Sequence, residues 1–210
     1  MILHGYWRSG TAYRTRIALN LKGLTYGQVG VDLRQGDQKS AAYLKLNPQG
    51  LVPALEVDGL VLTQSPAILE WLEETRPEPP LLPADTTGRA RVRAMAALVG
   101  CDIHPLNNLR VLKVLRESFD AAPAQTDAWA ARWITAGFAA LEALVAEHGD
   151  GWSYGSTPGL ADCYLIPQIY SARRFHVALD AWPRLLAIES AAEAHPAFIA
   201  AHPDRQPDAD

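Results

Sequence analysis

The sequence predicts two domains of different class, an α/β unit followed by an all-helical bundle. Strand and helix signals alternate over residues 1–80 in the order β-α-β-α-β-β-α, which makes a small α/β unit with a mixed sheet. Four prolines stand within residues 76–88, a composition typical of an interdomain linker. Beyond it the long segments have helical spacing and no strand signals, as in a helical bundle. The predicted domains are residues 1–80 and 89–210, joined by a linker at 81–88.

The first domain opens with a short apolar strand at residues 2–7. From Thr11 the apolar residues recur at helical spacing, and Gly23 stands where a left-handed residue would end that helix. A second strand is predicted at residues 25–33. A short helix follows and ends before Pro48, because the residue before a proline is biased away from the helical conformation.

Two turn signals complete this domain. Asp58-Gly59 lies between two apolar runs and predicts a β-hairpin. Ser65 and Pro66 then fit the N-cap and the first position of a third helix. In the second domain, helices are predicted at roughly residues 89–118, 125–148, 160–173 and 182–194, and the polar tail "HPDRQPDAD" is expected to be frayed.

Composition argues against several classes of function. A net charge of −4 and a pI near 5.9 disfavour a nucleic-acid partner and a basic membrane-binding face. His4, Arg8 and Arg14 interrupt the apolar N-terminal stretch, so we expect no signal peptide, and no apolar run is long enough to span a bilayer. Cys101 and Cys163 form no C-x-x-C pair, which favours reduced thiols in the cytoplasm. The six histidines are scattered without an H-E-x-x-H motif, so no metal site is expected.

The stretch "WRSGT" marks the junction between the first strand and the first helix. Arg8, Ser9, Gly10 and Thr11 stand where the first backbone N–H groups of the helix point outward, a setting that suits an anion. On spacing alone, the common role of Ser9 there is to cap the helix. The same residues could also bind a ligand.

The architecture, together with "LVPAL" and "TQSPAILEWLEE", resembles the cytosolic glutathione transferases. "RSGTAYRTRIALNLKG", "GCDIHPLNNLRVL" and "ADCYLIPQIYSARRFHVAL" resemble segments of the zeta class and of its maleylacetoacetate and maleylpyruvate isomerases. This resemblance implies a thioredoxin-like N-terminal domain and a helical C-terminal domain. Where the class commonly has Ser-Ser-Cys, this chain has Ser9-Gly10-Thr11, which looks more like the maleylpyruvate isomerase branch. Gly159 replaces the usual Ser or Thr three residues before Asp162, which can still reach back to the N-cap N–H.

The resemblance implies that the anion beside Ser9 and Thr11 is the sulfur of glutathione, with one hydroxyl donating to the thiolate. Ser9 is favoured over Thr11. A cis peptide is implied between Val52 and Pro53, with the backbone of Val52 pairing with the cysteinyl part. The remaining implied contacts of the first domain are the γ-glutamyl carboxylate site at Gln64 and Ser65 and a further contact at Gln49.

In the second domain, His104-Pro105 interrupts the first long helix, because proline bends a helix or removes one of its hydrogen bonds. The resemblance implies that Asp102, His104 and Asn108 face the glutathione of a partner subunit in a homodimer. Without the resemblance, His104 would be read as a polar residue at a kink.

Three arginines, Arg8, Arg110 and Arg174, are implied to converge on a substrate with a carboxylate at each end, because the arginine fork binds carboxylates in a bidentate manner. Arg173 is interpreted as structural, since successive helical residues point about 100° apart. Arg14 and Arg16 are interpreted as structural partners of acidic residues.

The expected function is glutathione-dependent cis–trans isomerisation of a maleyl keto acid, with Ser9, Thr11 and Arg8 as catalytic residues and no metal. Maleylpyruvate and maleylacetoacetate both remain possible as substrates, in aromatic-compound or tyrosine breakdown. A broad glutathione transferase that conjugates electrophiles is the main alternative. A non-catalytic dimerisation module is disfavoured by the intact thiol site, and a disulfide-exchange enzyme by the lack of a cysteine at residues 9–11.

Overall fold

A computed structural model describes all 210 residues, which form two compact units. The first unit joins Met1–Leu81 to Ala194–Asp210, and the second is Leu82–Glu193. None of the helices is both long enough and apolar enough to cross a bilayer.

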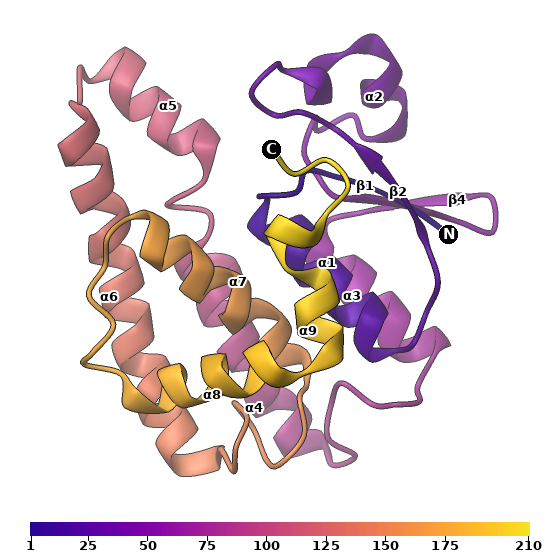
Figure 1. Ribbon diagram of the computed structural model, residues 1–210, viewed down its shortest axis with the longest axis vertical. Coiled ribbons are helices and arrows are strands. Elements are labelled where there is room, and N and C mark those ends of the chain that lie inside the picture. Colours follow the sequence, from indigo (N-terminus) through magenta and orange to yellow (C-terminus); the bar gives the residue numbers. More distant parts are fainter. The chain divides into compact units, whose positions relative to one another are not determined.

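A four-stranded mixed sheet forms the centre of the first unit (Figure 1). The strand order is β2-β1-β3-β4, in which β1 and β2 are parallel and the other two pairings are antiparallel. Asp58 and Gly59 both have positive φ and close the predicted hairpin between β3 and β4. The strands are β1 (Ile2–Gly5), β2 (Gly27–Gly30), β3 (Ala54–Val57) and β4 (Leu60–Thr63).

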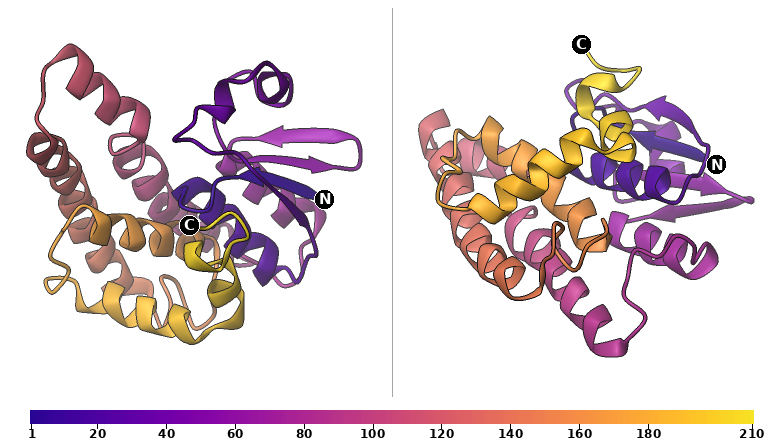
Figure 2. Two further views of the ribbon diagram at one scale, coloured as in Figure 1. Left: turned by 45° about the horizontal axis from the view of Figure 1, so that its top comes forward. Right: turned by 60° about the horizontal axis from the view of Figure 1, so that its bottom comes forward.

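Helices cover both faces of this sheet. Figure 2 shows α2 (Ala41–Leu46) on one side and α1 (Gly10–Leu21) and α3 (Ser65–Thr75) on the other. The order and packing are those of a thioredoxin-like domain, as expected. Gly23, at φ 66, ends α1 in the left-handed conformation that the sequence predicts. The buried core between the sheet and these helices includes Leu3, Leu55, Ile17, Ile68 and Leu69.

The polar tail belongs to this unit and is not frayed, so that expectation is wrong. It contains the 3₁₀ turn η3 (Pro203–Arg205), and its Asp208 carboxylate accepts from Trp7 N. The helix that precedes the tail, α9 (Pro196–Ala201), packs on α1. The buried Arg16 donates to the carbonyl oxygen of Ala201, and Asn20 donates to that of Ala197. These are contacts between residues far apart in the chain, and local composition carries no signal for them.

The second unit is a helical bundle, as predicted. The predicted helix at 89–118 is divided, because α4 passes into a π-helical segment, η2, in which His104 N donates to Val99 O at 2.8 Å. A turn that contains Pro105 then separates η2 from α5. The helices are α4 (Thr86–Ala97), η2 (Leu98–Ile103), α5 (Leu109–Ser118), α6 (Pro123–His148), α7 (Leu160–Arg174) and α8 (Pro183–Ala194).

The buried helix α7 begins with the cap that the sequence predicts. The Asp162 carboxylate accepts from Gly159 N at 2.8 Å and from both the backbone N and the hydroxyl of Ser153. Burial raises the pKa of Asp162, while these hydrogen bonds act in the opposite direction. The residues that begin α7 are thereby tied to the loop that precedes it.

Candidate functional site

Ser9 and Thr11 lie together at the N-terminus of α1. The Ser9 hydroxyl accepts from Ala12 N at 3.3 Å, so Ser9 does cap the helix. Thr11 Oγ1 donates to the carbonyl oxygen of Val52 at 2.9 Å and lies 3.0 Å from Ser9 Oγ. Because the single Thr11 proton is used in the bond to Val52, Ser9 is the donor in the contact between the two hydroxyls, and its proton is directed at Thr11 Oγ1. The geometry therefore distinguishes the hydrogen bonds of the two hydroxyls, which the sequence alone does not.

The turn before β3 lies next to these hydroxyls. Val52–Pro53 is a cis peptide, as expected from the resemblance. Val52 is half-buried, and the bond from Thr11 joins it to the start of α1. Thr11 and Val52, the residues at the two ends of this bond, both belong to the predicted site.

Two residues that sequence reasoning missed hold this turn. The buried Asn47 donates to Leu51 O at 2.7 Å and accepts from Gln49 N at 3.1 Å. Tyr43 donates its hydroxyl proton to the same Leu51 carbonyl at 2.7 Å. Burial raises the pKa of Tyr43 to about 12, although a hydrogen bond with Asn47 acts in the opposite direction. An asparagine before Pro48 is a local turn signal, so the role of Asn47 could have been found from the sequence.

The start of α3 forms the third part of the site. Gln64, not Ser65, is the N-cap, because Ile68 N bonds to Gln64 O, and so Ser65 is the first helical residue. Gln64 has φ 66, a left-handed conformation that is uncommon for a residue other than glycine and often marks a functional site. Its side-chain nitrogen donates to Gln49 Oε1, which brings two predicted ligand contacts together.

A buried arginine supports Ser65 from inside the unit. Arg14 Nη1 donates to Ser65 Oγ at 3.0 Å, and each residue is only 2% exposed. The Ser65 oxygen accepts this bond, so its own proton is available to an anion. The first N–H groups of α3 have no partner within the helix and add to an anion-binding environment. Sequence reasoning assigned Arg14 only a structural role.

Arg16 also has a structural role, although the partners seen here are carbonyl oxygens. Its guanidinium, in a residue only 1% exposed, donates to Trp7 O at 2.8 Å and to Ala201 O at 2.9 Å. Arg8, the first predicted substrate ligand, is half-exposed and lies over the ring of Trp7, 5.2 Å from its centroid.

In the second unit, Asp102 and His104 lie at the end of the π-helical segment, where Asp102 is exposed and His104 half-exposed. Asn108 caps α5, and its side-chain oxygen accepts from Arg110 N at 3.1 Å. The cap therefore fixes the backbone from which the exposed Arg110 side chain extends.

The two neighbouring arginines at the end of α7 have different surroundings. Arg173 forms an ion pair with Glu189 of α8, with Nε 2.9 Å from Oε1, and this hydrogen bond raises the pKa of Arg173. Arg174 is exposed and is the last residue of α7. Arg173 therefore has the structural role that the spacing indicates.

The first unit thus has the thioredoxin-like order of elements, a serine at the start of α1, a cis-proline turn, and a buried arginine behind the start of α3. These features together define the N-terminal domain of the glutathione transferase class. Family comparison agrees: residues 8–75 match the glutathione S-transferase N-terminal domain, and residues 127–189 match the glutathione S-transferase C-terminal domain.

Individual relatives narrow the class. The chain is 54% identical over 210 residues to a maleylpyruvate isomerase of a Ralstonia species, covering 99% of both chains. It is also 54% identical to a maleylacetoacetate isomerase of Pseudomonas aeruginosa, covering 99% of this chain and 98% of that one. A solved maleylacetoacetate isomerase of Anaeromyxobacter dehalogenans with bound glutathione is 49% identical, with a TM-score of 0.90 over 100% of this chain and 97% of the other. The chain belongs to the glutathione S-transferase family, in the zeta class with its maleylacetoacetate and maleylpyruvate isomerases.

Proposed function

We propose that this protein is a glutathione-dependent cis–trans isomerase that converts a maleyl keto acid, maleylpyruvate or maleylacetoacetate, to its fumaryl isomer. The observation that carries the proposal is the Ser9 hydroxyl. It stands at the N-terminus of α1 and donates to Thr11 Oγ1, because Thr11 donates its own proton to Val52 O, and rotation of the hydroxyl would turn the Ser9 proton from Thr11 to a bound thiolate. A free thiol has a pKa of about 8.5, and a helix N-terminus with a hydroxyl donor lowers it.

The residues of the first unit fit glutathione. Gln49, Gln64 and Ser65 would hold its γ-glutamyl end, with Arg14 behind Ser65 to balance the carboxylate charge. The backbone of Val52 before Pro53 would pair with the cysteinyl part, and Ser9 would donate to the sulfur. When bound, glutathione supplies a thiolate nucleophile that adds to the electron-poor double bond and is later eliminated, which permits the bond to rotate.

Arg8, Arg110 and Arg174 would hold the two carboxylates of the substrate. Their guanidinium groups also favour the negative charge that develops on the keto oxygen during the reaction. An arginine side chain remains positively charged at every physiological pH, so the binding of the substrate carboxylates does not depend on the protonation state of these residues. We further propose that the protein works as a cytoplasmic homodimer in which Asp102, His104 and Asn108 contact the partner's glutathione.

A coupled spectrophotometric assay tests the function. The purified protein is given maleylpyruvate or maleylacetoacetate, each with and without glutathione, and a fumaryl-specific hydrolase detects the product. We expect turnover only with glutathione, and the ratio of the two kcat/KM values identifies the physiological substrate. Activity on a chloro-nitro-aromatic compound without any on the maleyl acids would instead support a conjugating transferase.

The neighbouring arginines offer a matched pair of variants. We expect Arg174→Ala to lose at least about 100-fold in kcat/KM, the usual effect of removing a group that stabilises developing charge, while glutathione affinity is retained. Arg173→Ala breaks the pair with Glu189 and should keep activity within about threefold, because the Arg173 side chain is 55% exposed and already committed to Glu189. Normal turnover by Arg174→Ala would remove Arg174 from the site. Isothermal calorimetry with glutathione checks that both variants retain the thiol site.

A further inference from the structure

Both backbone polar groups of Trp7, the residue before Arg8 and Ser9, are held by side chains from distant parts of the chain. The Trp7 N–H donates to the Asp208 carboxylate at 2.9 Å, across 201 residues of sequence. The Trp7 carbonyl accepts from Arg16 at 2.8 Å, and Arg16 also donates to Ala201 O at 2.9 Å. Residues 201–210 therefore reach Trp7 by two routes, one direct and one through a buried guanidinium.

Further contacts hold Asp208 in place. The buried Gln206 donates to Ala200 O at 3.0 Å and to His202 O at 2.6 Å, and it accepts from Gln28 of β2 at 3.1 Å. A Cβ atom added at Gly30 of β2 would lie 3.2 Å from the Cβ of Asp208, so this strand position leaves room for the segment.

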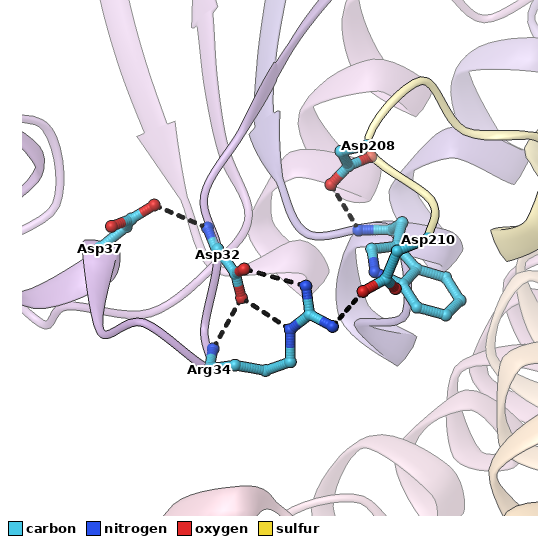
Figure 3. A network of polar contacts seen from close by, with 6 residues as sticks. Asp32, Arg34, Asp37, Asp208 and Asp210 are labelled. Atoms are coloured by element: carbon cyan, nitrogen blue, oxygen red, sulfur yellow. Dashed lines mark hydrogen bonds and ion pairs between the residues drawn. The ribbon is translucent and has the colours of Figure 1, made fainter.

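A network of charges surrounds this contact. Arg34 bonds to Asp32 and to Asp210, as the close-up view shows (Figure 3). The same view shows Asp208 on the tail with a carboxylate oxygen directed at a backbone nitrogen, which is that of Trp7. The hydrogen bonds from Arg34 lower the pKa of Asp32, so the acid stays ionised beside the tail.

The position of Trp7 determines where two functional groups begin. The Trp7 ring is only 7% exposed, and the Arg8 guanidinium lies over it. Ser9 follows, and its backbone N–H returns to Tyr6 O at 2.9 Å, so residues 6–9 form one tight turn. A movement of the Trp7 peptide would therefore shift the hydroxyl of Ser9 and the guanidinium of Arg8 together.

We propose that Asp208 is a positioning residue of the isomerase site, which holds the Trp7 amide so that Arg8 and Ser9 keep their places. This inference rests on the proposed function. The role proposed for Asp208 is separate from the ion pair that Asp210 of the same tail forms with Arg34. The side chains of that pair are 53% and 48% exposed, and exposed ion pairs contribute little to stability.

Four variants of the full chain test the proposal. Asp208→Ala removes the acceptor of the Trp7 N–H, whereas Asp208→Asn retains an oxygen acceptor. Asp210→Ala removes the pair with Arg34 but leaves the Trp7 contact. Asp204→Ala is the matched control, since it lies in the same segment and its side chain is 71% exposed.

We expect Asp208→Ala to lose at least about tenfold in kcat/KM, because displacement of reacting groups by about 1 Å can cost about 100-fold. The loss should fall mainly on kcat, and the acidic limb of the pH profile should move to higher pH, because the bound thiol ionises less readily. Asp208→Asn should recover most of the rate, while Asp210→Ala and Asp204→Ala stay within about twofold. A wild-type rate and pH profile in Asp208→Ala would overturn the proposal, as would an equal loss in Asp210→Ala.

Amide hydrogen exchange gives a readout that does not depend on activity. Exchange in the peptide that contains residues 6–9 should quicken in Asp208→Ala and return toward the wild-type rate in Asp208→Asn. Unchanged exchange in Asp208→Ala would overturn the proposal. If the wild-type protein isomerises neither acid, the proposed function fails, whereas the exchange result still reports whether Asp208 holds the turn. If Asp208→Ala does not fold, Asp208→Glu, whose carboxylate is displaced by one methylene, should show the same change in rate and exchange.

Discussion

Replacement of Ser9 tests two roles of one hydroxyl at the start of α1: the helix cap that the structure shows and the donation to the thiolate that we propose. Ser9→Ala removes the cap on Ala12 N and also removes the proton that would be donated to the thiolate. The cap bond, at 3.3 Å, is longer than a typical N–H···O bond of about 2.7–3.2 Å. Its loss should therefore lie at the low end of the cap range, about 0.5–1 kcal/mol.

The activity effect should be far larger than the stability effect. For a chain of about 200 residues, 1 kcal/mol lowers Tm by about 2–4 °C, so Ser9→Ala should melt only a few degrees lower. Loss of a donor to developing or bound negative charge costs about 100-fold or more in rate. Because so small a loss of stability leaves the protein folded, the fall in kcat/KM would report the thiolate contact.

Two companion variants isolate the roles. Ser9→Asp retains a good cap, so Tm should return to the wild-type value, but its carboxylate repels a thiolate and activity should stay lost. Thr11→Val loses the bond to Val52 O, a cost of about 1 kcal/mol, yet keeps the Ser9 hydroxyl and should keep activity within about tenfold. The measurements are kcat/KM in the coupled isomerase assay and Tm by calorimetry. If Thr11→Val is inactive while Ser9→Ala turns over normally, the assignment of Ser9 as the donor to the thiolate is refuted.

Three further predictions concern the scaffold. Lys22→Met should destabilise the protein by about 3–5 kcal/mol, because it leaves the buried Glu73 carboxylate without the ammonium at 2.6 Å, and the double variant with Glu73→Leu should recover much of that loss in urea unfolding. Gly137→Ala should lower the free energy of unfolding by about 1–3 kcal/mol, because the added Cβ would lie 2.3 Å from Ile103 Cδ1. In a double-mutant cycle, the same substitution should cost less stability in the Ile103→Ala background. The pKa of Tyr43 is raised to about 12, so its contribution to stability is complete below the unfolded value near 10 and is lost as pH rises through 12. Absorbance titration of Tyr43→Phe should lack one phenol that ionises near pH 12, and an unchanged titration would contradict this.

Local rules predicted most of the fold. The hairpin at Asp58-Gly59, the stop at Gly23 and the cap by Asp162 all depend on residues within a few positions of one another, so their signals lie within a short window of sequence. The start of α3 was placed one residue late, because Gln64 adopts a left-handed conformation that its residue type does not favour. The helix predicted at 89–118 is interrupted near His104-Pro105, as the proline predicted. No local sequence pattern predicted the π-helical turn before it.

In the candidate site, too, features set by neighbouring residues could be predicted and contacts between distant residues could not. The residues proposed to face the ligand, Ser9, Gln49, Gln64 and Ser65, could be named from the sequence by resemblance, because they stand in short recognisable motifs. Their supports could not be named in this way. Arg14 reaches Ser65 across 51 residues, and Asp208 reaches Trp7 across 201.

By itself, therefore, the sequence determined the class of each unit and, by resemblance, the family, and it named the residues proposed for the thiol site. Only the tertiary structure decided that Thr11 donates to Val52 O, that the buried Arg14 lies behind Ser65, and that Asp208 of the polar tail accepts from Trp7 N. The physical reason is that helix caps, hairpins and apolar spacing are set by neighbours in the chain, whereas a hydrogen-bond partner for a buried group is set by whichever segment folding brings beside it.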